Sequence, residues 1–192
     1  TSSAASDVYK RQPDTSIPGA NLRAGIGYIS GVKCMIMIDD SGIKAGAASE
    51  ATIDKALGCL DIALKQKLPC VHLVESAGVD LPNYSVKLWS KFGSVFYKKA
   101  KLSAAGIPVI AILHGFSTAG GAYQIGMSDY VIGVKGNGMA ALAGSALLKA
   151  ATGENATNSD IGGVEMHSVV TGSVEYLVND DAESIVTVRQ LI

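Results

Sequence analysis

The sequence predicts an α/β fold built on a mostly parallel β-sheet. Short apolar runs at 70–75, 109–113 and 130–134 alternate with longer stretches that repeat apolar residues at helical spacing. Glycine and proline mark the boundaries, as at Pro69 and in the "GIP" of residues 106–108. This rhythm is typical of crossover units, in which a helix carries the chain from one parallel strand to the next.

The first half of the chain supplies a hairpin and a long helix. Residues 25–40 contain two strand-like runs around the turn signal Ser30-Gly31. A helix is predicted over 50–67, and Ser49 is placed to cap its N-terminus. The apolar residues of this helix recur on one face, at Ile53, Leu57, Leu60 and Leu64.

The second half repeats the alternation. A helix that contains Trp89, Phe92 and Phe96 is predicted to end near residue 105, ahead of the strand at 109–113. Asp180 is expected to cap the last helix, with Glu183 reaching back to it. Between the strand at 109–113 and the last helix we expect four elements. They are a helix at 120–127, strands at 130–134 and 139–143, and a helix at 145–152.

The composition excludes several classes of protein. The chain has 16 basic and 17 acidic residues, which argues against a nucleic-acid surface because phosphate binding needs clustered Lys and Arg. No run of 18 apolar residues predicts a membrane span. The cysteines Cys34, Cys59 and Cys70 form no metal-binding or disulfide pattern, so we expect buried thiols and no metal. With no secretory signal at the N-terminus, we expect the cytoplasm, or the mitochondrial matrix in a eukaryote.

The N-terminal residues 1–12 differ in character from the rest. They are polar and aperiodic and lack an initiating Met, so we interpret them as a linker or foreign tail. Residues 13–192 are expected to form a single domain. Because the chain stops inside a helical pattern, that domain is expected to be partial.

Two loops of small residues follow apolar strands. One is the "SAGVD" of residues 76–80, and the other is the "STAGG" of residues 117–121. Ligands bind at the carboxyl ends of strands in open α/β sheets, and a helix that starts at Gly120-Gly121 leaves its first N–H groups unpaired. Side by side, the loops would donate two N–H groups to one oxygen and form an oxyanion hole. Small residues also allow close helix–sheet packing, and this alternative stays open.

Several motifs in a fixed order carry a family resemblance. They are "GIGYISGVKCMIMIDD", "VHLVESAGVDLP", "LSAAGIPVIAILHGFSTAGGAYQIGMSDYVIGV", "LLKAATGE" and "DIGGVEMH". In this order they resemble the carboxyltransferase (beta) subunit of biotin-dependent acyl-CoA carboxylases, of the methylcrotonyl-, geranyl- and propionyl-CoA carboxylase type. The resemblance covers residues 24–192, which is nearly the whole chain behind the tail.

The resemblance implies a crotonase (ClpP/crotonase-like) superfamily fold, with a parallel sheet and β-β-α crossover units. It implies that the chain is part of the N-terminal of two such domains, which holds acyl-CoA as substrate. It further implies a homo-oligomer, a hexamer in the complete protein. Biotin is implied as a cofactor carried on a biotin carboxylase or biotin carrier partner, and not attached to this chain.

The implied reaction transfers a carboxyl group from carboxybiotin to the α or γ carbon of an acyl-CoA, through a thioester enolate. By the family's motifs, Gly120 and Gly121 would provide one oxyanion donor, and Gly78 and Val79 the other. The resemblance implies substrate contacts from further small residues, namely Ala77, Ser117, Thr118, Ala119, Gly144 and Ser145. One departure affects the last two: the chain has "AGSALLKAATGE" where relatives often have "GGPPLVKAATGE", which leaves the acyl group unassigned.

Other polar residues have structural interpretations. His72 lies in a strand and is expected to be a satisfied core residue, and His167 is expected to bond a backbone group. His114 precedes the second loop and could line the site. Tyr123 falls one turn into the predicted helix, where packing is its expected role.

The sequence is compatible with three function classes. The carboxyltransferase is preferred over an enoyl-CoA hydratase or isomerase, for which Glu75 and Asp80 could act as acid and base, although Asp80 is more simply a turn residue. A non-catalytic assembly relative is the third. "GFSTAG" approximates the G-x-S-x-G motif of serine hydrolases, but Ser117 has no His or Asp partner evident by spacing.

Overall fold

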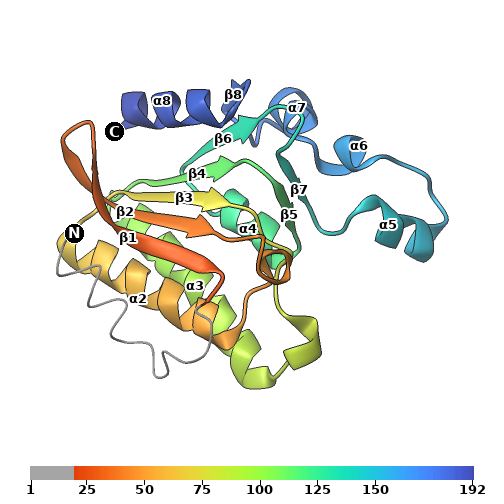
Figure 1. The fold of residues 1–192 in the computed structure, drawn as a ribbon, viewed down its shortest axis with the longest axis horizontal. Helices are drawn as coiled ribbons and strands as arrows, with labels where there is room; N and C mark the ends of the chain where they lie inside the picture. The colour runs from red at the N-terminus through yellow and green to blue at the C-terminus, as the bar shows by residue number, and fades with distance from the viewer. Residues whose placement is uncertain (1–19) are drawn as a thin grey trace.

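The computed structural model describes residues 20–192, and its centre is a six-stranded sheet (Figure 1). The strand order is β1-β2-β3-β4-β6-β8, in which β1 and β2 are antiparallel and every other neighbouring pair is parallel. The strands are β1 (Leu22–Ile29), β2 (Val32–Asp39), β3 (Cys70–Val74), β4 (Val109–Leu113), β6 (Tyr130–Val134) and β8 (Tyr176–Val178). The predicted tail, residues 1–12, lies outside the described residues.

Helices connect these strands, and two short strands form a separate pair. The helices are α2 (Glu50–Gln66), α3 (Val86–Ala104), α4 (Gly120–Gly126), α5 (Ser145–Thr152), α6 (Asn158–Gly162), α7 (Val164–Met166) and α8 (Asp181–Leu191). Strands β5 (Phe116–Thr118) and β7 (Met139–Ala141) pair in parallel beside the main sheet. Short 3-10 turns lie at Lys44–Gly46 and Leu81–Asn83, and a π-helical turn at His167–Thr171.

Local chemistry explains where the first elements begin and end. Ser30 and Gly31 both have positive φ, of 49° and 84°, which suits the two-residue turn of a twisted hairpin. The Ser49 side chain accepts from the Thr52 amide, while the Thr52 side chain accepts from the Ser49 amide. This reciprocal cap starts α2, and Lys67 ends it in the left-handed conformation ahead of β3.

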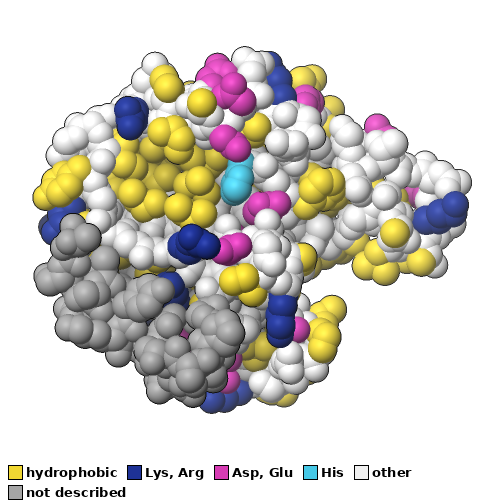
Figure 2. Space-filling view, in the orientation of Figure 1, with side chains coloured by type: hydrophobic (Ala, Val, Ile, Leu, Met, Phe, Trp, Pro, Cys, Tyr) yellow, Lys and Arg dark blue, Asp and Glu magenta, His cyan; other side chains and the backbone are white. Residues whose placement is uncertain are grey.

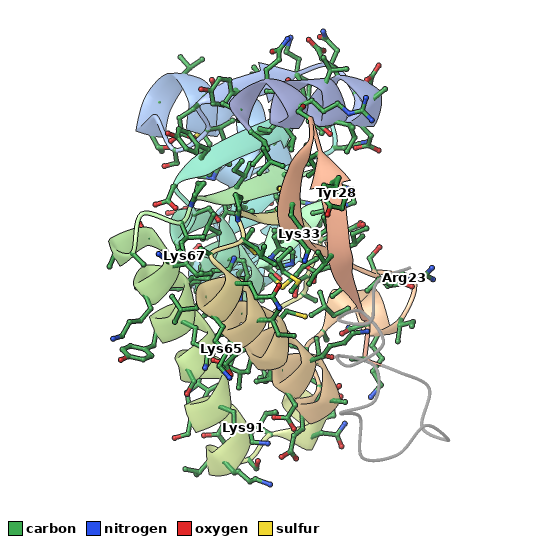
Figure 3. All side chains as sticks on the ribbon, turned by 90° about the vertical axis from the view of Figure 1, so that its left-hand side faces the viewer. Arg23, Tyr28, Lys33, Lys65, Lys67 and Lys91 are labelled. Carbon is green, nitrogen blue, oxygen red and sulfur yellow. The ribbon has the colours of Figure 1, made fainter. Side chains whose placement is uncertain are left out.

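The apolar core divides between the two faces of the sheet. On one face, α2 and α3 pack beside each other against β1–β4, and their core includes Met35, Ile53, Leu60 and Phe92 (Figures 1 and 3). Outside this contact, Lys91 of α3 pairs with Glu50 and Asp54 of α2. Because surface ion pairs contribute little, the buried apolar face is the main source of stability here.

Helix α8 covers the other face at the β6–β8 end of the sheet (Figure 1). The hairpin turn reaches across to this helix, where Ser30 Oγ donates to the Arg189 carbonyl oxygen over 2.7 Å. Figure 2 shows hydrophobic side chains gathered between the β1–β2 hairpin and α8. Partly buried Ile29 and Leu73 pack there against the core on this face.

Most predicted elements are confirmed, with several differences. The helix predicted at 120–127 ends one residue earlier, and the strand predicted at 139–143 is only Met139–Ala141. Strands β5 and β8 were not predicted, because three residues are too few to show a period. The π-helical turn was not predicted either. Asp180 caps α8 as expected, but the Glu183 carboxylate accepts from the Asn179 amide rather than from the capping residue.

Candidate functional site

The two small-residue loops follow neighbouring parallel strands and meet each other. The first loop, residues 76–80, follows β3, and the second loop, residues 117–121, follows β4 and opens α4. The Thr118 amide donates to the Ser76 carbonyl oxygen over 2.9 Å. A methyl group at Gly78 would lie 3.4 Å from the Gly120 nitrogen. The sequence-based expectation that the loops lie side by side is therefore realised in the structure.

The glycine pair allows this close approach. A methyl group added at Gly121 would lie 2.3 Å from the Ser76 carbonyl oxygen, and one added at Gly120 would lie 2.3 Å from Cε1 of Phe92. Both distances are far below contact, so no side chain can replace hydrogen at either position without movement. The packing role left open by the sequence is thus present, and it sets the spacing between the two loops.

Backbone N–H groups at this junction are left without acceptors. The amides of Val79, Gly120 and Gly121 have no hydrogen-bond acceptor among residues 20–192. For the two glycines, the reason is that the first amides of a helix have no partner within it. The Gly78 amide is occupied, since it donates to Ser76 Oγ over 3.2 Å. Each of the two loops therefore carries at least one amide that no described residue accepts from.

Ala119 stands at the sharp turn between β5 and α4. Its φ of 49° and ψ of −118° lie in a region that L-residues rarely adopt. In a nucleophile elbow, the serine occupies the sharp strand-to-helix turn. Here that position holds a methyl group, while Ser117 is fully buried within β5 and its hydroxyl has no partner among the described residues. The geometry gives no support to a serine hydrolase.

A third segment, Lys44–Gly46, supports the first loop from behind. Ser76 Oγ donates to the Gly46 carbonyl oxygen over 2.8 Å, and the Ala77 amide donates to the Ala45 carbonyl oxygen over 3.0 Å. Gly46 has a φ of 71°, and a methyl group there would lie 2.2 Å from the Glu75 carbonyl oxygen. In the sequence, the signal for this segment is the density of Gly and Ala in residues 42–48.

The carboxylate of Asp80 serves the turn, as expected. It accepts from Lys44 Nζ over 2.9 Å and from Asn83 Nδ2 over 2.8 Å. These hydrogen bonds, with that of Lys44 the larger cause, hold the pKa of Asp80 below its usual value. A carboxylate held ionised in this way is a poor acid, which weakens the hydratase interpretation that paired it with Glu75.

Beneath the loops lies a buried polar chain that sequence reasoning only partly anticipated. His72 Nε2 lies 3.2 Å from Asp39 Oδ1, and its Nδ1 lies 3.5 Å from Lys99 Nζ. Burial lowers the pKa of His72, and burial lowers the pKa of Lys99 to about 8. His72 was expected in the core, and the structure confirms this. The helical repeat could have indicated the burial of Lys99, because this residue falls on the buried face of α3. The other buried residues of that helix are Leu88, Phe92, Val95 and Leu102.

A small cavity of about 40 Å³ adjoins this polar chain. Ser76 and Gly121 line it from the two loops and Gly46 from the third segment, and His72 and Gln124 are among its polar lining. A volume of this size accommodates a water molecule but no acyl chain.

The remaining predicted residues lie elsewhere. Gly144 and Ser145 lie at the start of an arm formed by α5 and α6, which projects from the body (Figure 1). Ser145 lines an open groove along this arm with Lys149 and Asp160. The Ser145 amide donates to Asn158 Oδ1 over 2.8 Å. In this structure neither residue hydrogen-bonds to the two loops.

The other candidate side chains have the following partners. His167 Nε2 lies 2.7 Å from the Ala140 carbonyl oxygen, which confirms its predicted structural role. His114 Nε2 is buried and has no partner among the described residues. Tyr123 packs its ring 5.5 Å from that of Phe96 but remains 60% exposed.

The comparison with known families decides the relationship. The family model "Carboxyl transferase domain" matches residues 2–192. The chain belongs to the carboxyl transferase domain family. Its α/β architecture and mostly parallel sheet are those of the crotonase-like carboxyltransferases among its structural neighbours.

Curated relatives of this carboxyl transferase domain cover nearly the whole chain. It is 42% identical over 174 residues to a probable biotin-dependent acyl-coenzyme A carboxylase beta2 subunit of Mycobacterium tuberculosis. It is 41% identical over 178 residues to the mitochondrial methylcrotonoyl-CoA carboxylase beta chain of Arabidopsis thaliana. These matches cover 91% and 92% of the chain but only 33% and 30% of the relatives, so the chain spans about a third of their length.

Solved structures give the same relationship. The beta subunit of geranyl-CoA carboxylase from P. aeruginosa superposes with a TM-score of 0.82 at 41% identity, over 90% of this chain and 32% of that one. The transcarboxylase 12S structure, described as a hexamer with hydrolysed methylmalonyl-coenzyme A bound, also gives 0.82, at 26% identity over 89% of this chain and 33% of that one. In the part of this carboxyl transferase domain that the structure describes, no helix is long and apolar enough to cross a bilayer, and no acidic, His or Cys cluster suits a metal ion.

Proposed function

We propose that this chain is the acyl-CoA-binding part of the carboxyltransferase subunit of a biotin-dependent acyl-CoA carboxylase. It would form part of the N-terminal domain of that subunit. The chain spans about a third of the curated relatives it matches, which supports placing it within a longer subunit.

One observation supports the proposal above all: two loops that pack against each other at a junction of small residues both carry unpaired amides. Carboxyl transfer to a thioester proceeds through an enolate, whose oxygen needs N–H donors that are already in place. In our proposal the Val79 amide donates from the first loop, and the Gly120 and Gly121 amides donate from the second. Gly78 then has a conformational role, since its own amide is occupied by Ser76 Oγ.

The chain's residues act on the substrate by position and polarity. The thioester carbonyl lies against Ala119, with Ala77 and Thr118 beside it, and accepts from the unpaired amides. When the α or γ carbon loses its proton, the negative charge that moves to this oxygen meets donors already fixed by loop packing. Removing one such donor typically costs about 10²–10³ in turnover. Ser117 shapes the floor from within β5, and Gly144 and Ser145 border the acyl or CoA moiety from the arm.

The cofactor and partners in the proposal belong to the longer protein. Carboxybiotin would supply the carboxyl group and the base that takes the substrate proton, and the unpaired amides fit a carbonyl oxygen in that chemistry. Biotin would be carried by a biotin carboxylase or biotin carrier partner, and the complete subunit would assemble as a homo-hexamer. We place it in the cytoplasm or, in a eukaryote, the mitochondrial matrix.

The proposal is tested by what the enzyme adds to a thioester. Full-length protein that contains this chain would be incubated with its biotin carboxylase partner, ATP, bicarbonate and a panel of acyl-CoA and enoyl-CoA thioesters. Mass spectrometry distinguishes gain of a carboxyl group from gain of water. We expect carboxylation of at least one thioester, dependent on biotin. Hydration without biotin would establish a hydratase, and no product from a folded oligomer would indicate an assembly relative.

A further inference from the structure

A chain of buried polar groups joins the two halves of the site from beneath. It begins at the Glu75 amide, directly before the first loop, which donates to Asp39 Oδ2 over 3.2 Å. It continues through the 3.2 Å contact between Asp39 and His72. It ends at Lys99, whose Nζ donates to the Gln124 carbonyl oxygen of α4 over 3.1 Å.

One protonation pattern satisfies all these contacts. If neutral His72 carries its proton on Nε2, it donates to Asp39, and its Nδ1 faces the ammonium of Lys99 as an acceptor. Burial keeps His72 neutral by lowering its pKa. The side chain of Lys99 is 0% exposed, so its charge lies in a medium of low dielectric constant.

The ammonium of Lys99 lies near the carboxyl-terminal end of α4, and the proposed oxyanion lies at the amino-terminal end. A cation placed there complements the helix dipole, whose positive end faces the oxyanion. The four residues from Gly120 to Gln124 rise about 6 Å, and a hydrogen-bond length of about 3 Å at each end places the cation and the oxyanion on the order of 12 Å apart. Attraction over that distance at an effective dielectric constant of about 20 corresponds to about tenfold in rate.

We infer that Lys99, held by His72 and Asp39, is a positioning residue that fixes α4 against the first loop and stabilises the oxyanion electrostatically. This inference rests on the proposed function. It assigns a reason for keeping a charged side chain in the apolar stripe of α3, where burial of a lone charge is costly. Four groups face Lys99 and set its ionisation: Cys70 and His72 on β3, Asp39 on β2 and the Gln124 carbonyl on α4. His114 in turn faces His72.

The test compares the pH dependence of turnover in three full-length proteins. In the unmodified protein, kcat for carboxyl transfer is expected to fall as pH rises past about 8, where Lys99 loses its proton. Lys99→Met is expected to lose about tenfold in kcat at pH 7, with KM for acyl-CoA little changed and the alkaline fall absent. Lys98→Met, which removes the neighbouring lysine paired with Asp61 on the surface, is the matched control and should behave as the unmodified protein.

Asp39→Asn keeps the test decisive if Lys99→Met does not fold. The carboxylate of Asp39 favours the charged form of Lys99, so its neutral isostere should move the alkaline fall to lower pH. A folded Lys99→Met protein with unchanged kcat, or an alkaline fall at the same pH in Asp39→Asn, would overturn the inference. If the unmodified protein is inactive with every thioester, the proposed function fails and this inference with it.

Discussion

Replacing Gly121 with Ala tests whether the spacing of the two loops controls turnover. The new methyl carbon would lie 2.3 Å from the Ser76 carbonyl oxygen, whereas unstrained contacts are about 3.5 Å or longer. Relief therefore needs movement on the order of 1 Å. Because the same carbonyl accepts from the Thr118 amide, the movement displaces both loops and the donors they carry.

The expected losses differ between activity and stability. Misplacement of positioned groups by this distance costs about 10²-fold in turnover. Overpacking costs about 1–3 kcal/mol of the free energy of unfolding. The assay measures kcat for biotin-dependent release of carbon dioxide by the full-length protein at saturating thioester, with urea denaturation in parallel.

Gly126→Ala is the matched control for this substitution. Gly126 ends the same helix, and an added methyl group there would have no atom within 4 Å. Alanine favours a helix over glycine by up to about 1 kcal/mol, so stability should hold or rise while turnover is unchanged. A folded Gly121→Ala protein whose turnover stays within about twofold of the unmodified protein would refute the reasoning, since the displacement is expected to cost far more.

Three further predictions concern stability. Ser49→Ala should lower the free energy of unfolding by about 1 kcal/mol in denaturant titrations, because it removes the cap of α2; no change would mean that the cap is not formed. Ala119→Gly should raise the free energy of unfolding by about 1 kcal/mol, since glycine adopts this φ without strain. A lower free energy of unfolding would contradict the strained turn. Burial depresses the pKa of Lys99 to about 8, so the folded state binds fewer protons than the unfolded state above that pH. The unmodified protein should therefore gain stability relative to Lys99→Met between pH 8 and 10, by up to about 3 kcal/mol; parallel curves for the two proteins would contradict this.

The sequence-based predictions succeeded where one element carries its own pattern. Helix α2 was predicted to within a residue, because its cap, its apolar face and Pro69 beyond its end all agree. Parallel strands such as β4 are buried on both faces and read as continuous apolar runs. The two loops were found because small residues follow these strands directly.

The parts that were missed depend on contacts between distant segments. Strand β5 exists only through its pairing with β7, and three residues are too few to show alternation. Lys99 reads as a surface residue by type, and only its place in the stripe of α3 indicates burial. Its partners His72 and Asp39 are brought to it by the sheet register and come from two other strands. The steric reason for each glycine of the pair likewise depends on Phe92 and Ser76.

Release of carbon dioxide by the full-length protein is the most direct measurement of the proposed carboxyl transfer. The protein would be given methylmalonyl-CoA, malonyl-CoA or methylglutaconyl-CoA with and without free biotin, which runs the carboxyl transfer in reverse. We expect release from at least one thioester that requires biotin and falls about 10²-fold in Gly121→Ala. A folded oligomer that releases no carbon dioxide from any of them, or releases it equally without biotin, would contradict the proposed carboxyl transfer.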